Sequence, residues 1–191
     1  MKSAANDAEV LRLIRSVLRE GAPVVIDGVG AFFLNANGDV GFQPEPRPRV
    51  FIAYASEDEE PAGRLYRALR RHGFSAWRDQ EKLLPGQNWP RAIERAIERS
   101  DFFIACLSKN SIIKRGYFQS ELRYAIDLAR RVPVGEIFVI PARLDKCRMP
   151  ATIGDETHYV DLFSDWERGI AKVVRAMHRE AHRRQQQLEL V

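Results

Sequence analysis

The first segment with a clear hydrophobic pattern is residues 7–20, which place apolar side chains at helical spacing. Gly21 and Pro23 follow it and are typical of a helix end. Three short apolar runs then predict strands: Val24–Ile26, Ala31–Leu34 and Val40–Phe42. The pair Asn37-Gly38 between the last two runs is a turn signal. The pattern therefore predicts a helix followed by a β-hairpin.

A second pattern begins after a proline-rich connector. Pro44, Pro46 and Pro48 favour a stiff, extended backbone. We place a domain boundary there, with an N-terminal extension at residues 1–48 and a larger domain at residues 49–191.

In the larger domain, short apolar runs alternate with amphipathic segments. The apolar runs predict strands: Val50–Tyr54, Phe74–Trp77, Phe102–Leu107, Ile137–Ile140 and an edge strand at His158–Val160. The amphipathic segments predict helices: Glu59–Arg71, Trp89–Arg99, about 117–130 and about 165–187. This alternation implies right-handed crossovers and a parallel sheet, so the fold class is α/β.

A parallel sheet binds ligands outside the carboxyl ends of its strands. The segments that follow Tyr54, Trp77 and Leu107 should therefore converge on one cleft. Glu121 lies four residues after Tyr117 in the predicted helix, so a carboxylate and an aromatic ring share one helix face there.

Composition narrows the range of partners. The chain has 191 residues, is 45% hydrophobic and 29% charged, and carries a net charge of +4, as an ordinary globular protein does. The charge is too small and too scattered to predict a nucleic-acid partner. Cys106 and Cys147 form no disulfide or metal-binding pattern. No apolar run approaches the roughly 20 residues that span a bilayer. We expect a soluble, cytoplasmic protein without a membrane segment.

Five segments resemble, in order, the TIR domain (Toll/interleukin-1 receptor homology) of the bacterial type over about residues 49–180. They are FIAYASED (51–58), GFSAWRDQEKLLPGQNW (73–89), SDFFIACLSKNS (100–111), GYFQSEL (116–122) and IPARLD (140–145). The resemblance implies a flavodoxin-like five-stranded parallel sheet flanked by helices. The helix and hairpin of residues 1–48 would then be a small extension.

The resemblance also implies an activity, because many relatives of this type cleave NAD⁺. NAD⁺ would be the substrate, with no cofactor and no metal. Glu121 matches the catalytic carboxylate of these relatives. Residues expected to contact the substrate are Tyr54, Ser56, Trp77, Asp79, Lys82 and Tyr117. Ala55 and Ser56 stand where relatives carry arginines, so Lys82 or Arg78 is a candidate for the phosphates.

Two functions stay open. In the first, the chain is an NAD⁺ hydrolase or cyclase that acts in prokaryotic immune defence or signalling and is active on self-assembly. In the second, it is a non-catalytic adaptor that binds other TIR domains in signal transduction. The resemblance places the interaction loop at Leu83, Leu84, Pro85 and Gly86. Either function predicts a homo-oligomer or filament on activation. Linear and cyclic ADP-ribose both remain possible products.

Three other sequence signals, for a dinucleotide site, a metal site and a DNA-binding fold, are weaker. Gly28 and Gly30 lack the third glycine and the following helix of a dinucleotide-binding fingerprint, so we reject that interpretation. His178 and His182 share a helix face but lack a third metal ligand. Residues 1–48 resemble part of the histone-like HU fold, without its DNA-gripping arms. They are slightly acidic, which opposes DNA binding, so we expect a packing or dimerisation module.

Overall fold

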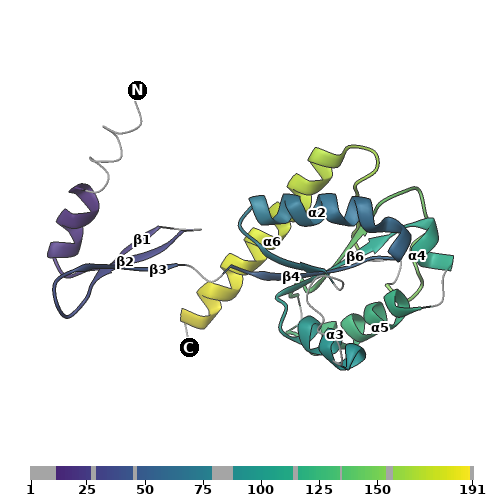
Figure 1. The fold of residues 1–191 in the computed structure, drawn as a ribbon, viewed down its shortest axis with the longest axis horizontal. Coiled ribbons are helices and arrows are strands. Elements are labelled where there is room, and N and C mark those ends of the chain that lie inside the picture. Colours follow the sequence, from purple (N-terminus) through teal and green to yellow (C-terminus); the bar gives the residue numbers. More distant parts are fainter. Residues whose placement is uncertain are drawn as a thin grey trace. The chain divides into compact units, whose positions relative to one another are not determined.

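The computed structural model describes residues 12–26, 29–44, 47–78, 88–113, 116–133, 135–153 and 157–189. The chain divides into two compact units, Met1–Arg47 and Pro48–Val191. Figure 1 shows the elements of both units along the chain. Each unit is described by itself.

The smaller unit contains a helix over residues 12–19 and a three-stranded antiparallel sheet. Its strands are β1 (Val24–Ile26), β2 (Gly30–Leu34) and β3 (Val40–Pro44), in the order β1-β2-β3. The β2–β3 turn is closed by the Asn35 side chain, whose Oδ1 accepts from the backbone N–H groups of Asn37 and Asp39 at 2.9 Å each. Gly38 adopts the positive φ of 82° that this turn requires. The three predicted strands are thus confirmed, and the strand predicted at Val24–Ile26 pairs with the hairpin as β1.

The larger unit confirms the predicted α/β fold. Its five strands pair in parallel in the order β5-β4-β6-β7-β8. They are β4 (Arg49–Ala53), β5 (Ser75–Arg78), β6 (Phe102–Leu107), β7 (Val139–Arg143) and β8 (Val160–Asp161). The helices are η1 (Ser56–Asp58), α2 (Glu59–Arg71), α3 (Trp89–Glu98), α4 (Lys109–Ile113), α5 (Tyr117–Ala129) and α6 (Trp166–Glu189).

The central strands explain why helices cover both faces of the sheet. All six residues of β6 are buried, as are the last four of β4. A strand that is apolar on both sides needs a helix layer on each. Val50 and Ile52 pack in a core with α2 and α6, whereas Phe51 and Ala53 pack in a second core with α3 and α5. Figure 1 shows these two layers.

Two strands lie elsewhere than the sequence predicts. We expected a strand at Ile137–Ile140, but β7 runs from Val139 through Pro141 to Arg143. Proline normally ends a strand because it has no N–H to donate. It is tolerated here because β8 pairs with β7 from Ala142 onward, so Pro141 has no partner strand on that side. The edge strand starts at Val160 rather than His158.

The helices are placed by capping and close packing. Asn88 caps α3, with its Oδ1 accepting from the Arg91 N–H at 3.3 Å. Gly169 lets the first turn of α6 approach β8. A Cβ atom at Gly169 would lie 2.8 Å from the Asp161 carbonyl oxygen and 2.7 Å from Leu162 Cδ2. Within the described residues, no helix has the length and apolar character needed to cross a membrane.

We expect Gly169→Ala to lower the free energy of unfolding by about 1–3 kcal/mol, because the new methyl group overlaps backbone. An ordinary Gly→Ala change inside a helix stabilises by roughly 0.5–1 kcal/mol. All three tryptophans (Trp77, Trp89 and Trp166) lie in the larger unit, so their fluorescence during urea unfolding reports that unit.

The matched control is Gly63→Ala in α2. Its nearest contact, at 3.0 Å, is the end of the flexible Arg78 side chain, which can move. The interpretation fails if Gly169→Ala is as stable as the unmodified chain.

Candidate functional site

The candidate site lies at the carboxyl edge of the parallel sheet. Chain segments leave this edge after each strand: the segment after β4 forms η1, and the segment after β6 forms α4 and then the start of α5. The helix α5 begins there and packs back against β4, β7 and α3. Residues in its first two turns are therefore held close to the carboxyl ends of the central strands.

Glu121 is a buried carboxylate in the second turn of α5. It is 5% exposed, and its neighbours Phe118, Leu122 and Ala125 are buried in the core that also holds Phe51. Burying an ionised carboxylate is costly, so such groups are found paired, hydrogen-bonded or at functional sites. The structure thus places this ionisable side chain on the inward face of the helix.

The sheet beneath α5 changes from large to small side chains toward its carboxyl edge. Trp77, Phe51 and Phe103 lie side by side on neighbouring strands, with ring centroids 4.8 Å and 5.4 Å apart. Two residues further along the strands, Ala53 and Ala105 face each other on the same side. Small side chains let a helix approach a sheet closely. Trp77 is half-buried and packs against the same core as α5, so it lies on the α5 face of the sheet.

Tyr54 and Ser56, the other two predicted substrate contacts with described side chains, are placed differently. Tyr54 is 5% exposed and belongs to the core with α2 and α6, on the opposite face of the sheet from α5. Ser56 begins η1 at the surface, and its Oγ donates to Glu57 Oε2 at 3.1 Å. Tyr54 is therefore not brought together with Trp77 and Glu121 on one face.

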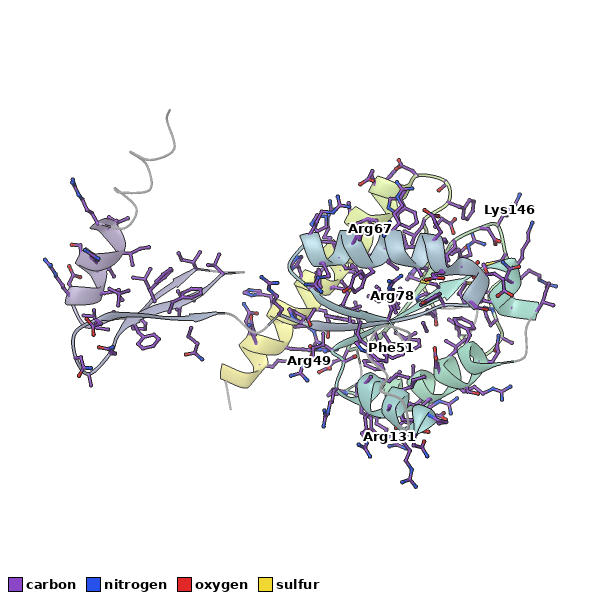
Figure 2. All side chains as sticks on the ribbon, viewed as in Figure 1. Arg49, Phe51, Arg67, Arg78, Arg131 and Lys146 are labelled. Atoms are coloured by element: carbon purple, nitrogen blue, oxygen red, sulfur yellow. The ribbon has the colours of Figure 1, made fainter. Side chains whose placement is uncertain are left out.

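Several predicted positions fall outside the described residues. These are Asp79 and Lys82 among the substrate contacts, and Leu83, Leu84, Pro85 and Gly86 of the interaction loop. Tyr117 is the first residue of α5, but its side chain is also outside the described part. Arg78, the other candidate for the phosphates, lies between the sheet and α2, with its guanidinium 5.0 Å from the centre of the Tyr66 ring (Figure 2).

The sequence analysis missed a second buried carboxylate at this edge, Asp58. It is 6% exposed and ends η1. Its Oδ2 accepts from Ser108 Oγ at 2.5 Å, and its Oδ1 accepts from Asn110 Nδ2 at 3.3 Å. Burial, together with the Asp58 charge, raises the pKa of the Cys106 thiol far above its usual range, so this thiol stays protonated.

The Asp58 contact continues into α5 through a chain of hydrogen bonds. Ser111 N–H donates to Ser108 Oγ at 3.0 Å, and Ser111 Oγ accepts from Ser108 N–H at 2.8 Å. Gln119 Nε2, in the first turn of α5, donates to the Ser111 carbonyl at 2.7 Å. The α5 N-cap, Gly116, supplies no capping side chain. This chain of bonds therefore anchors the start of the helix that carries Glu121.

The carboxyl end of β7 is fixed by its own cluster. Arg143 donates to both carboxylate oxygens of Asp161, at 2.5 Å and 2.8 Å, and to the Cys147 carbonyl at 2.8 Å. The hydrogen bond with Asp161 raises the pKa of Arg143. The guanidinium also lies 4.3 Å from the centre of the Tyr159 ring. Asp145, just after β7, accepts from the Lys109 N–H at 3.1 Å, which joins this segment to α4.

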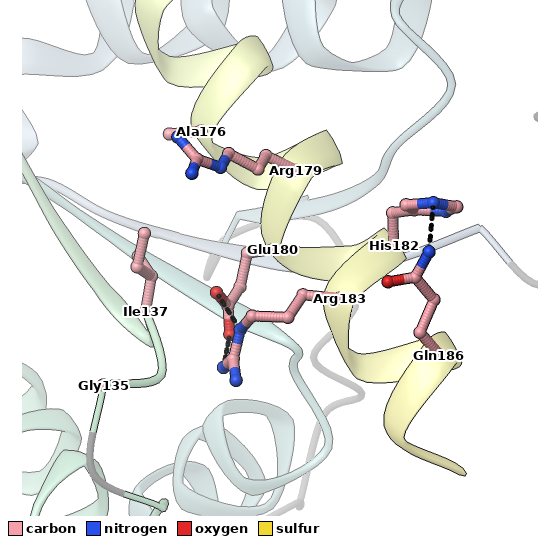
Figure 3. A pocket seen from close by; sticks show the side chains of 8 residues that line it. All are labelled: Gly135, Ile137, Ala176, Arg179, Glu180, His182, Arg183 and Gln186. Atoms are coloured by element: carbon pink, nitrogen blue, oxygen red, sulfur yellow. Dashed lines mark hydrogen bonds and ion pairs between the residues drawn. The ribbon is translucent and has the colours of Figure 1, made fainter. Parts of the chain in front are cut away.

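A pocket of about 590 Å³ lies elsewhere, beside α6 and the segment that leads into β7 (Figure 3). Buried Glu180 there accepts from Arg183 at 2.6 Å and 3.1 Å and from Arg184 at 3.2 Å. Burial opposes ionisation of Glu180, but these hydrogen bonds prevail and lower its pKa. Arg184 also donates to the Ile137 carbonyl at 2.9 Å. The carboxylate is satisfied by its arginines, so we interpret the cluster as an anchor for α6.

The histidines of α6 have neighbours of their own. The His178 ring lies 4.7 Å from the Phe74 ring, and His182 Nε2 lies 3.0 Å from Gln186 Nε2. Across the described ranges, no three His, Cys, Asp or Glu side chains are grouped as a metal site requires.

Comparison with known proteins places this geometry in a family. Residues 50–174 match the family model described as TIR domain. Protein y4cD of Sinorhizobium fredii (strain NBRC 101917 / NGR234), described as uncharacterized, is 28% identical over 143 residues. That match spans 74% of this chain and 22% of y4cD.

Two solved structures share the fold. The TIR domain of the Toll-related receptor TRR-2 from Hydra magnipapillata is 25% identical with a TM-score of 0.52, over 66% of this chain and 97% of that one. The TIR domains of the activated Roq1 resistosome, which recognises the pathogen effector XopQ, are 17% identical with a TM-score of 0.52. That match covers 70% of this chain and 99% of the Roq1 chain.

We expect Asp58→Ala to lower the free energy of unfolding of the larger unit by about 1–3 kcal/mol, because it leaves the buried Ser108 hydroxyl without its acceptor. Glu59→Ala, in the same acidic run but exposed, should change it by less than about 0.5 kcal/mol. Urea unfolding followed by tryptophan fluorescence measures both.

A double-mutant cycle makes this test specific. Ser108→Ala combined with Asp58→Ala should cost clearly less than the sum of the two single changes, because both remove one interaction. Strict additivity would contradict the interpretation.

Proposed function

Because the chain belongs to the TIR domain family, which includes NAD⁺-cleaving members, we propose that it breaks the bond between nicotinamide and ribose in NAD⁺. Glu121 is the catalytic carboxylate of this proposal. The observation that carries it is the burial of Glu121 on the inward face of α5, at the edge of the sheet where parallel folds bind ligands.

The chemistry suits a site with one carboxylate. The C1′–N1 bond breaks with its electron pair moving into the cationic nicotinamide ring, which leaves neutral and needs no proton. Positive charge develops on C1′ and the ring oxygen of the ribose, as in glycoside hydrolysis. A carboxylate held out of water stabilises that charge better than one in bulk solvent. Water then adds to C1′ and releases a proton, giving ADP-ribose.

The face that carries Glu121 also offers a binding surface. Trp77 is half-buried on the α5 side of the sheet and packs against Phe51, which is fully buried, so Trp77 is the ring of this pair that a ligand can reach. Aromatic rings of this kind stack on flat, cationic groups such as the nicotinamide ring. Ser56 lies at the surface after β4, where its oxygen can accept a hydrogen bond from a ribose hydroxyl while its own hydroxyl donates to Glu57. The contacts of Tyr54, Asp79, Lys82 and Tyr117 stay predictions.

The proposal includes self-association and a place in immune defence or signalling. The Roq1 structure is described as a resistosome that contains TIR domains, so association is known for that protein. Relatives of this family often complete their site only between neighbouring copies, and an isolated chain would then be rarely competent. The adaptor function is the competing proposal. A measurement of NAD⁺ turnover by assembled chains distinguishes the enzyme from the adaptor.

The test is nicotinamide release from NAD⁺ by concentrated, purified chain, compared with Glu121→Gln. We expect Glu121→Gln to lower the rate by at least about 100-fold, in the range found when a transition-state charge loses its partner. Separation of linear from cyclic ADP-ribose then identifies the product.

Asp127→Asn is the matched control for this test. It makes the same carboxylate-to-amide change on the same helix, but Asp127 is exposed and faces Arg130. It should keep the full rate. Turnover that survives in Glu121→Gln overturns the catalytic assignment, and no turnover by chains that sedimentation shows to be assembled favours the adaptor.

A further inference from the structure

The parallel sheet stops short at its β8 edge. β7 has five residues, but β8 has two, which pair with Ala142 and Arg143. In the described part of the chain, no strand pairs with Val139–Pro141 on that side. A cavity of about 560 Å³, called here the edge cavity, lies beside this unpaired part of β7.

Aliphatic side chains provide most of the lining of the edge cavity. They come from the end of α5, from β7 and β8, and from the segment that leads to β8: Ile126, Ala129, Val139, Ile140, Ile153 and Val160. The polar side chains of Thr152, Thr157 and His158 also line it. The edge cavity is therefore mainly apolar, with a few polar groups, as small-molecule sites usually are.

Several polar groups of this lining already have partners. Thr157 Oγ1 donates to a main-chain carbonyl at 2.6 Å. Arg130 pairs with Asp127 at 3.3 Å. Glu136 pairs with Arg184, also at 3.3 Å. A ligand rich in hydrogen-bonding groups, such as a nucleoside, would lose its water there without finding enough partners, whereas an aliphatic chain needs none.

The edge cavity continues into the pocket beside α6. Ile137 and Ala176 line both of them. The α6 pocket adds donors from one face of the helix, which include Arg179 and Gln186. One continuous groove thus has an aliphatic half beside β7 and a cationic half beside α6.

Arg179 is the cation of this groove that is left for a ligand. The other charges of the α6 pocket balance one another, because Glu180 pairs with Arg183 and Arg184 at 2.6 Å and 3.2 Å. Arg179 is exposed and has no ion-pair partner among the described residues. Figure 3 shows it extending from α6 on the Ala176 side of the pocket, whereas Arg183 turns to Glu180.

Pro141 argues against an added β-strand as the occupant. The Leu162 N–H donates to the Arg143 carbonyl at 2.8 Å, so Arg143 directs its main-chain groups to the β8 edge. Pro141, two residues earlier, faces the same edge because main-chain groups alternate along a strand. Proline has no N–H, so a further strand could not form a complete ladder there. The groove suits a small molecule better than a peptide strand.

We propose that this groove binds an amphipathic anion, namely a monocarboxylate with a flexible aliphatic chain. The chain lies in the edge cavity, and the carboxylate binds the Arg179 guanidinium, whose forked donors match two carboxylate oxygens. The edge cavity and the α6 pocket, at about 560 Å³ and 590 Å³, each have the size of a small-molecule site. Glu121 lines neither, so this site does not depend on NAD⁺ cleavage.

The test is isothermal titration calorimetry of the full-length chain with octanoate, decanoate and dodecanoate, all below the concentrations at which they form micelles. Each further CH₂ group should tighten binding about fourfold until the edge cavity is full, because it removes apolar surface from water. 1-Octanol lacks the charge and should bind at least about 10-fold more weakly than octanoate, because it loses the charged hydrogen bonds to Arg179.

Two matched variants locate the carboxylate. Arg179→Gln should weaken dodecanoate binding at least about 10-fold. Arg175→Gln makes the same change at an exposed position one turn earlier on α6, outside the lining, and should leave binding unchanged. Both positions are exposed, so neither variant should unfold the chain.

A third variant locates the chain of the ligand. Ala129→Phe fills part of the edge cavity and should remove the gain in affinity from octanoate to dodecanoate, while urea unfolding confirms that the variant is folded. The proposal is wrong if no carboxylate binds, if affinity does not rise with chain length, or if the two arginine variants bind dodecanoate equally well.

Discussion

A parallel sheet whose central strands β4 and β6 are buried almost throughout must be covered by helices on both sides, and the rest of the larger unit follows from this constraint. β6 is buried along its whole length. Because the strands are parallel, each of them ends at the same edge of the sheet. The loops after β4, β6 and β7 therefore meet at this carboxyl edge. Polar side chains gather at this edge because the buried residues of β4 and β6 below it are apolar.

Among the described residues, Asp58 and Glu121 are buried carboxylates at the carboxyl edge, and their surroundings differ. Asp58 binds side chains that follow β6, Ser108 and Asn110, and so joins two loops. Glu121 lies on α5, on the other side of the sheet, among apolar neighbours. We interpret the Asp58 contacts as structural, whereas the catalytic role of Glu121 is the proposal made above. The bond between Gln119 and Ser111 connects them, because it holds the first turn of α5 against the anchored loop.

The strongest sequence predictions were those supported by burial on both faces. Phe102–Leu107 is continuously apolar and is β6 at those bounds. Because of Pro141, the sequence pattern predicted that β7 ends at Ile140. A proline is tolerated inside β7 because β8 pairs only from Ala142 onward, and the sequence does not show where that pairing begins. α4 was missed because five residues carry too little periodicity.

The site was harder to predict than the fold. Asp58 stands in a run of four acidic residues, 57–60, and the contact with Ser108, 50 residues away, is what distinguishes it. Tyr54 continues the alternation of Val50 and Ile52, which places its ring with α2 and α6. The sequence places Glu121 on a helix, but its burial depends on how α5 lies on the sheet.

The central claim is that the carboxyl edge beside α5 holds the nicotinamide ribose. The most direct measurement is an experimental structure of the assembled Glu121→Gln chain with intact NAD⁺. The account predicts the C1′ atom of that ribose within contact distance of the residue 121 side chain, on the Trp77 side of the sheet. NAD⁺ bound instead in the α6 pocket beside Arg179 and Arg183, or on the α2 side of the sheet, would contradict it.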